Sequence, residues 1–378
     1  MRHSVPSPEE SLALAERVNE KYRPVWNGRS QEERVALARY FLPHSSRKPV
    51  LGPTRPRVIK WYCPFAAQAD FPSGHRYCIN VFSGCAHKCV YCYAMSYSAA
   101  EPAIKKDFER MIDRDMDDLE RFDVPPAPVH LSNSTDPFQP LEASSGHTKY
   151  ALAQILAHRH RFTSVRILTK NPRMPVQLGY VDILKKLMEL PLEHPFAAKT
   201  QKNGFPGFCI EVSMAFWREE ARSAYDPCDP IIDERKEGIR ALRQAGIPVV
   251  LRIDPLFPRG RLGDSLARTY ADFGLVEPQS AEDVDNLVGF AKEMEALYVV
   301  YSPAKIVQPR GRKLSPIMQA MRRLYDHVAA PDKLTFRGGA WRLPDAFARA
   351  QVTEPFLETC RRFGMAAKYC KHNLIETP

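Results

Sequence analysis

Short apolar segments alternate with longer amphipathic segments between residues 76 and 302, and this alternation constrains the fold more than any other feature of the chain. The short segments have the length of buried strands, whereas the longer ones repeat apolar residues at three- and four-residue steps, as amphipathic helices do. The predicted strands are residues 76–83, 129–134, 164–169, 207–214, 248–254 and 297–302. The predicted helices between them are residues 108–122, 149–160, 181–190, 232–245 and 281–296.

Strands that are separated by helices pair in parallel through right-handed crossovers. Six such units are too few for a closed eight-stranded barrel, and the sequence after Ser302 contains no strong strand. We therefore predict an α/β fold, a partial (β/α)6 TIM-type barrel with an N-terminal helical extension and a C-terminal extension.

Three regions follow from this pattern. Residues 1–75 are predicted to form an N-terminal helical extension, with helices at 9–22 and 31–42 and a Pro-rich arm. Residues 76–305 form the predicted core, and residues 306–378 form the C-terminal extension.

Polar residues follow several of the predicted strands. In parallel α/β sheets the reacting groups lie at the carboxyl ends of the strands. The residues at these ends include Ser134, Asp136, Lys170, Ser213 and Asp254. They are expected to face one site, in which Glu211 is a further candidate.

Cys85, Cys89 and Cys92 lie in one Gly-flanked loop after the first predicted strand. Thiolates are soft ligands that select zinc or iron–sulfur centres. A structural zinc needs four ligands in a closed tetrahedron, for which His87 is the candidate fourth. Three thiolates at spacings of four and three fit a [4Fe–4S] cluster with one open iron better, and zinc is the alternative.

The chain has nine cysteines in 378 residues, 44% hydrophobic residues, and no apolar run that approaches the ~20 residues of a membrane span. The N-terminus has no apolar signal segment. These features predict a cytoplasmic protein without a membrane partner, in which disulfides are not expected.

The CxxxCxxC pattern, with an aromatic residue just before its last cysteine, resembles the radical SAM superfamily. This resemblance implies that S-adenosylmethionine chelates the open iron. It further implies that one electron from the reduced cluster cleaves this cofactor to methionine and a 5′-deoxyadenosyl radical, with an electron donor of the flavodoxin or ferredoxin type.

A narrower resemblance covers about residues 78–258. The motifs at 84–94, 134–142, 168–170 and 233–235 look like the spore photoproduct lyase-related group, often described as DNA repair photolyases. The resemblance implies roles in binding S-adenosylmethionine. Tyr91 would lie beside the adenine, Ser134 and Asp136 near the amino group, Lys170 at the carboxylate and Ser213 at the ribose.

The sequence departs from this group at one chemically important place. Spore photoproduct lyases carry a cysteine that supplies a hydrogen atom just before their Thr-Ser-Asp segment, but here Asn133 or Ser134 stands there. N–H and O–H bonds are too strong to replace the thiol in this role. Further cysteines are candidates for core packing, like Cys209, or for a second metal site: Cys63, Cys78, Cys360 and Cys370.

Three functional hypotheses remain open at this point. The net charge of +10 and the subgroup resemblance favour a radical SAM enzyme that acts on a nucleic-acid base or nucleotide, with nucleic acid as a partner. The same cysteine loop would also serve a radical SAM enzyme of small-molecule biosynthesis or peptide modification. The third hypothesis is a zinc-binding module without radical chemistry.

Overall fold

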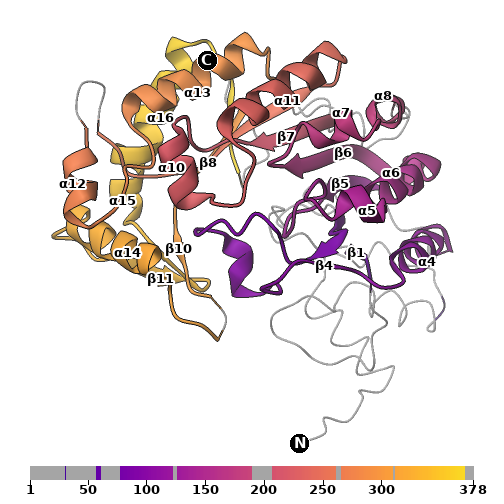
Figure 1. The fold of residues 1–378 in the computed structure, drawn as a ribbon, viewed down its shortest axis with the longest axis horizontal. Coiled ribbons are helices and arrows are strands. Elements are labelled where there is room, and N and C mark those ends of the chain that lie inside the picture. The colour runs from indigo at the N-terminus through magenta and orange to yellow at the C-terminus, as the bar shows by residue number, and fades with distance from the viewer. Residues whose placement is uncertain are drawn as a thin grey trace, which may run out of the picture.

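The computed structural model describes residues 30, 57–60, 77–121, 126–189, 207–260, 265–309 and 311–370 (Figure 1). The two helices predicted at 9–22 and 31–42, the arm that follows them, and Cys63 lie outside the described residues.

An eight-stranded sheet forms the centre of the described chain, and its neighbouring strands are parallel except for the antiparallel pair at one edge. The strands lie in the order β1 (Ile59–Lys60), β2 (Tyr77–Ile79), β5 (Ala127–Leu131), β6 (Phe162–Thr169), β7 (Phe208–Ser213), β8 (Val249–Leu256), β9 (Val299–Pro303) and β13 (Ala367–Tyr369). The chain is therefore a mixed α/β protein with a mostly parallel sheet, as the alternation of segments predicts.

The first predicted strand, residues 76–83, is two strands in the structure. β2 belongs to the central sheet, whereas β3 (Phe82–Ser83) pairs with β4 (Ala103–Ile104) in a separate hairpin. The chain leaves the central sheet at Asn80, whose side-chain carbonyl accepts a hydrogen bond from the Ser134 backbone N–H at 2.9 Å. The cysteine loop lies between the two strands of this hairpin and is not part of the central sheet.

Both extensions add strands to the sheet, although the sequence indicated no strong strand after Ser302. β1 pairs with β2, and β13 pairs in parallel with β9, where Lys368 lies opposite Val300. β13 has only three residues and its partner is far away in the sequence, so no local pattern could reveal it.

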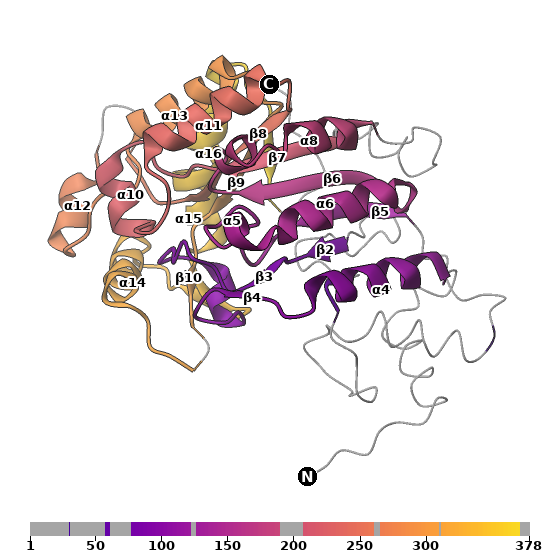
Figure 2. The same cartoon turned by 45° about the vertical axis from the view of Figure 1, so that its right-hand side comes forward.

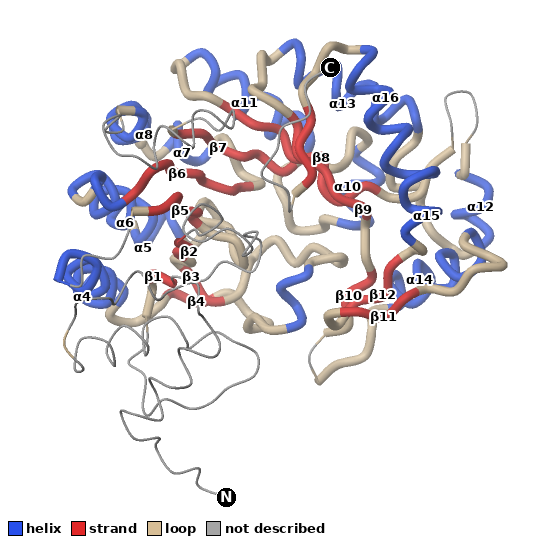
Figure 3. The backbone as a smooth tube through the Cα atoms, turned by 180° about the vertical axis from the view of Figure 1, so that it is seen from behind, coloured by secondary structure: helices blue, strands red, loops and turns tan. Residues whose placement is uncertain are grey.

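Five helices match the predicted amphipathic segments and lie along the outer side of the curved array of strands (Figures 2 and 3). They are α4 (Phe108–Arg121), α6 (His147–Ala157), α8 (Val181–Met188), α11 (Ile232–Gln244) and α13 (Ala281–Glu293). On α4, Phe108, Ile112, Met116 and Leu119 are buried, so one stripe of the helix packs on the core. Ser280 and Asp283 form a capping box that fixes the start of α13.

The remaining described elements connect these units or extend the C-terminal region. The short helical elements are α5 (Glu142–Ser145), α7 (Met174–Gln177), α10 (Glu219–Tyr225), α12 (Ala267–Asp272), η3 (Tyr93–Ser96) and η4 (Arg159–Arg161). The C-terminal region contains α14 (Pro316–Val328), α15 (Asp345–Ala348), a π-helical turn η5 (Arg349–Thr353), α16 (Glu354–Arg362) and the sheet β10 (Ile306–Val307), β12 (Ala340–Arg342), β11 (Thr335–Arg337). β10 contacts η3, so this region lies beside the cysteine loop (Figure 1).

The described helices include none whose length and apolar character would suit it to cross a membrane.

Candidate active site

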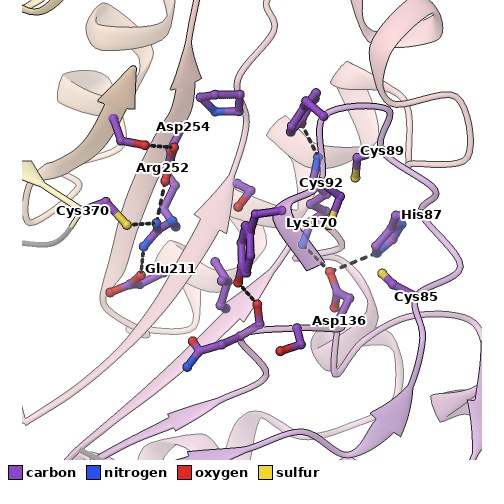
Figure 4. A pocket seen from close by; sticks show the side chains of 18 of the residues that line it. Cys85, His87, Cys89, Cys92, Asp136, Lys170, Glu211, Arg252, Asp254 and Cys370 are labelled. Atoms are coloured by element: carbon purple, nitrogen blue, oxygen red, sulfur yellow. Dashed lines mark hydrogen bonds and ion pairs between the residues drawn. The ribbon is translucent and has the colours of Figure 1, made fainter. Parts of the chain in front are cut away.

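A cavity of about 190 Å³ lies at the carboxyl ends of the parallel strands, with the cysteine loop on one side of it (Figure 4). The structure brings every sequence-predicted site residue to its wall: Cys85, Cys89, Cys92, Tyr91, Ser134, Asp136, Lys170 and Ser213. Glu211 and Asp254, which the sequence suggested as further candidates, also line it. These residues come from five segments of the chain and meet at one place, as strand ends of a parallel sheet do.

The cysteine loop depends on a glycine at its start. Gly84 has a φ of +69°, and a Cβ at this position would lie 2.3 Å from the backbone oxygen of Glu101. The Gly84 carbonyl also accepts a hydrogen bond from the Thr135 hydroxyl at 2.5 Å. The loop is thus held between the β3–β4 hairpin and the segment after β5, and no side chain larger than hydrogen fits at Gly84.

The spacing of the three sulfur atoms tests which metal centre this loop fits. Thiolates on one tetrahedral zinc lie about 3.8 Å apart, given Zn–S bonds of about 2.3 Å. Among the described residues, however, the cysteine-containing group whose ligand atoms lie within 4.8 Å of one another is Cys89, Asp226 and Asp229, not the three cysteines together. As their side chains lie in the structure, the three thiols are therefore not gathered around one point in the way that a single zinc requires.

His87 is not available as a fourth metal ligand in this arrangement. Its Nε2 lies 2.9 Å from Asp136 and its Nδ1 lies 2.7 Å from Asp229, with all three side chains almost fully buried. Burial alone would lower the pKa of His87, but the two carboxylates outweigh it and raise the pKa to about 10. In this arrangement a carboxylate engages each ring nitrogen, as suits an imidazolium that donates from both.

Asp136 joins the loop to the end of β6. Besides His87, its carboxylate accepts hydrogen bonds from the Thr169 hydroxyl at 2.8 Å and from the backbone N–H groups of Lys170 at 2.6 Å and Phe138 at 2.8 Å. Four donors from the chain thus occupy its two oxygens.

The Lys170 ammonium is enclosed in the same way. It lies 2.5 Å from Asp226 and 2.9 Å from Asp229, and it donates to the Tyr91 hydroxyl at 2.8 Å. Burial would lower its pKa, yet the two carboxylates raise it well above its usual value. The three partners match the three N–H donors of an ammonium group.

Arg235 completes this network from α11. Its guanidinium is fully buried, lies 2.9 Å from Asp229 and donates to the backbone oxygen of Ser213 at 3.2 Å. Three cations, His87, Lys170 and Arg235, therefore balance three anions, Asp136, Asp226 and Asp229. Such a balance is needed because isolated buried charges are costly. The sequence analysis did not identify Asp226 and Asp229, because they lie in a loop after α10 and their spacing in the sequence matches no motif.

The cavity wall also includes an aromatic ring and two hydroxyl groups, which belong to Tyr91, Ser134 and Ser213. The Tyr91 ring packs edge-on against Phe216 and Phe257, with centroids 6.0 Å away in each case. The Ser134 hydroxyl lies 3.1 Å from the Tyr97 hydroxyl, and Ser213 ends β7 half-buried.

The far side of the cavity carries a second charged group, centred on Arg252 (Figure 4). Its guanidinium lies 2.6 Å from Glu211 and 2.7 Å from Asp254, and it donates to the Cys370 sulfur at 3.0 Å. Cys370 follows β13 and so reaches the cavity only because the C-terminal extension joins the sheet. The sequence interpretation missed Arg252, which lies within a strand rather than at its end.

The cysteines proposed for a second metal site do not come together in the described structure. Cys360 is buried in α16, Cys370 lines the cavity, and Cys78 on β2 accepts a hydrogen bond from the Asn133 amide at 3.1 Å. No group of possible metal ligands among the described residues includes any of them. Among the described residues Cys360 packs within a helix and Cys370 follows the strand β13, whereas His372, which the tail would also contribute, lies outside the described residues.

No protein-family model matches the sequence, and a search of curated proteins finds no match. Solved structures do match the fold. A cysteine-to-serine variant of spore photoproduct lyase aligns with a TM-score of 0.53 and 14% identity, covering 84% of this chain and 79% of that one. A cysteine-to-alanine variant of the same enzyme with dinucleoside spore photoproduct aligns with a TM-score of 0.52 and 14% identity, covering 82% of this chain and 80% of that one.

A further structure, spore photoproduct lyase complexed with dinucleoside spore photoproduct, gives a TM-score of 0.50 at 14% identity. At such identity the likeness establishes the architecture. The resemblance read from the cysteine loop and the strand ends is confirmed at that level: the chain has the fold of spore photoproduct lyase.

Proposed function

We propose that the chain is a radical SAM enzyme in which Cys85, Cys89 and Cys92 hold a [4Fe–4S] cluster with one open iron. The observation that carries the proposal is the cysteine loop itself, which is fixed by Gly84 and borders a cavity at the strand ends. When bound, the reduced cluster would supply an electron to S-adenosylmethionine and generate a 5′-deoxyadenosyl radical that removes a hydrogen atom from the substrate.

The residues around the loop divide into contact and positioning groups. We assign Tyr91, Ser134 and Ser213 to contact with S-adenosylmethionine, because each offers a ring or a hydroxyl at the cavity wall. Asp136 and Lys170 take positioning roles instead, since their polar atoms are engaged by the chain. They orient the cysteine loop, Tyr91 and the end of β6. In this proposal β2 and β5–β9 form the predicted partial barrel around the cavity.

A nucleic-acid base or nucleotide is the substrate class we favour. The chain has a net charge of +10, and Lys305, Arg342 and Lys368 line the cavity. A solved structure of similar fold holds a dinucleoside photoproduct. Asn133 or Ser134 stands where the hydrogen-donating cysteine would be, so the reaction would differ from reversal of that photoproduct.

Salt dependence of binding tests the substrate class. Phosphate contacts release counterions, so affinity for single- or double-stranded DNA or RNA should fall steeply between 50 and 200 mM salt. A chain that binds none of these nucleic acids at 50 mM salt would instead favour the small-molecule or peptide alternative.

Removal of one buried thiol tests the cluster. We expect anaerobically reconstituted wild-type protein to contain about four iron and four sulfide ions per chain. Cys89→Ala should lose most of this iron and should form no 5′-deoxyadenosine with dithionite and S-adenosylmethionine. Cys228→Ser, which removes an exposed thiol from a nearby loop, serves as the control and should match the wild type.

Iron and zinc analysis of the same samples separates the remaining alternative. An iron-free wild-type protein that holds one zinc, or a Cys89→Ala variant that still forms 5′-deoxyadenosine, would contradict the proposal.

A further inference from the structure

The small sheet of the C-terminal extension brings two cations to the wall of the cavity. β10 and β12 pair antiparallel, with Ile306 opposite Trp341 and Val307 opposite Ala340. One step further along this register, Lys305 stands opposite Arg342. Residues that face each other across an antiparallel pair are close neighbours on one side of the sheet. Both of these side chains line the cavity, so the pair of cations faces the same space.

The neighbouring side chain on β12 shows which way Arg342 points. Trp341 packs under the guanidinium carbon of Arg322 on α14, at 4.2 Å from the ring centroid, and against Phe336 on β11 at 4.8 Å. Because side chains alternate between the two faces of a strand, Arg342 points away from this aromatic pair and toward the cavity. The Lys305 ammonium lies 5.9 Å from the ring centroid of Tyr93 on η3, which places it beside the cysteine loop.

Arg342 lacks the carboxylate partners that other cations of the cavity have. Arg252, for comparison, lies 2.6 Å from Glu211 and 2.7 Å from Asp254. Within the described part of the chain Arg342 forms no ion pair, and its Nε is buried without a hydrogen-bond partner. Like charges that face each other across two strands destabilise a sheet, and a buried donor without an acceptor is costly. The pair therefore calls for an anionic acceptor.

The charges on this side of the cavity do not cancel. Among the described residues, four cations line the wall against two carboxylates: Arg252, Lys305, Arg342 and Lys368 against Glu211 and Asp254. The groups of the proposed function leave this excess of two as it is. Three thiolates give an oxidised [4Fe–4S] cluster one net negative charge, and S-adenosylmethionine carries one net positive charge, so the two offset each other. The substrate remains as the source of the missing negative charge.

We propose that Arg342 and Lys305 bind a phosphate group of the substrate, so that the cavity selects a nucleotide over a free base or nucleoside. The inference rests on the proposed function and deepens it, because it names the group that this part of the cavity recognises. A guanidinium offers parallel N–H donors that match two phosphate oxygens, and an ammonium is a compact donor for a third. A nucleotide phosphate brings one negative charge within a strand and about two at a chain end.

Binding of matched probes tests the assignment. The probes are inorganic phosphate, thymidine, thymidine 5′-monophosphate, and thymidylyl-thymidine, whose phosphate lies between two nucleosides. Calorimetric titration uses reconstituted protein with S-adenosylmethionine and without reductant, so that the place of the cofactor is filled and no turnover occurs. Arg342→Gln removes the charge, whereas Arg342→Lys keeps the charge and loses the fork. Arg337→Gln is the control, since Arg337 is exposed on β11 of the same small sheet and does not line the cavity.

We expect the wild type and Arg337→Gln to bind thymidine 5′-monophosphate at least about tenfold more tightly than thymidine. Arg342→Gln should remove this difference and abolish the binding of inorganic phosphate, and Arg342→Lys should lie between the two. The thymidylyl-thymidine titration tells the two sources of phosphate apart. An affinity for it that falls in Arg342→Gln supports a phosphate within a strand, and an effect confined to the monophosphate supports a free nucleotide.

Stability separates this binding role from a structural one. In phosphate-free buffer Arg342→Gln should resist urea at least as well as the wild type, because it removes one of two opposed cations. Added phosphate should stabilise the wild type but not the variant, as a ligand of the folded state does. If both Arg342 variants are less stable than the wild type in phosphate-free buffer, and phosphate stabilises none of them, Arg342 is a structural residue and the proposal is overturned.

Equal affinity of the wild type for thymidine and its monophosphate, or no loss of phosphate binding in Arg342→Gln, would also overturn the inference. Failure of the proposed function gives a different result, because binding is measured without reductant. A chain that forms no 5′-deoxyadenosine but loses phosphate binding in Arg342→Gln refutes the radical chemistry alone. A chain that forms 5′-deoxyadenosine but binds no phosphate refutes the phosphate site alone.

Discussion

At the scale of single residues, the site depends on side chains that hold other side chains in place. His87, Asp136 and Lys170 looked from the sequence like direct partners of a metal or cofactor. In the structure their polar atoms bind one another and Asp229. Strand-end position predicts that a residue reaches the site, but the role it plays there depends on neighbours distant in sequence.

Gly84 is the residue whose replacement should separate loop geometry from general stability. In Gly84→Ala the new methyl group would meet the Glu101 backbone, and the left-handed backbone costs a further 1–2 kcal/mol, roughly, for any other residue. Gly146→Ala is the matched control, because Gly146 has a φ of +64° with nothing within 4 Å of an added Cβ.

We expect urea unfolding to show a loss of about 1–2 kcal/mol for Gly146→Ala and a distinctly larger one for Gly84→Ala. Iron per chain after reconstitution should fall only in Gly84→Ala. Equal stability and equal iron content in the two variants would show that the close contact with Glu101 does not shape the loop.

At the scale of elements, a ladder of charges ties three neighbouring strands together across the cavity floor. Glu211 on β7 lies 3.4 Å from Arg166 on β6 and 2.6 Å from Arg252 on β8. Burial would raise the pKa of the Glu211 carboxyl, but the guanidinium groups of Arg252 and Arg166 outweigh it and hold the pKa below its usual range. The ladder therefore stabilises the sheet only while Glu211 is ionised.

Glu211→Gln should destabilise the chain by about 3–5 kcal/mol at pH 7, because the buried guanidinium groups of Arg166 and Arg252 lose the carboxylate that they share, although Arg252 keeps Asp254. The pKa of the Glu211 carboxyl is lower in the folded chain than its unfolded value of 4.5. The ionised group therefore stabilises the fold fully above pH 4.5, and this stability is lost as the pH falls from there toward the folded pKa. The gap in unfolding free energy between wild type and variant should therefore narrow by about 2 kcal/mol between pH 5 and pH 3.

Glu234→Gln provides the control for this pH series. Glu234 and its partner Arg173 are both 41% exposed, so the change should cost less than about 1 kcal/mol at any pH. A Glu211→Gln gap that stays constant from pH 7 to pH 3 would contradict the assignment of an ionised Glu211.

Prediction from the sequence succeeded where periodicity is long and failed where elements are short. The predicted helix at 281–296 is α13, and the strand at 164–169 lies within β6, because each has enough residues to show a period. β13 is too short to show one. The cysteine loop was found from its spacing alone, whereas Asp226 and Arg252 became recognisable only through their contacts.

At the scale of the whole molecule, the cavity draws on the predicted C-terminal extension as well as on the predicted core. The C-terminal extension supplies Arg342, Tyr369 and Cys370 to its wall. The cysteine loop and the polar strand ends thus share one cavity with residues that follow the predicted core in the sequence.

Electron paramagnetic resonance of the reconstituted, dithionite-reduced protein, recorded before and after addition of S-adenosylmethionine, tests whether the loop holds a cluster with an open iron. A cluster in which Cys85, Cys89 and Cys92 leave one iron free should give a reduced [4Fe–4S] signal that shifts when the cofactor binds to that iron. A signal that S-adenosylmethionine leaves unchanged, or a protein that gives no iron–sulfur signal, would contradict the proposed function.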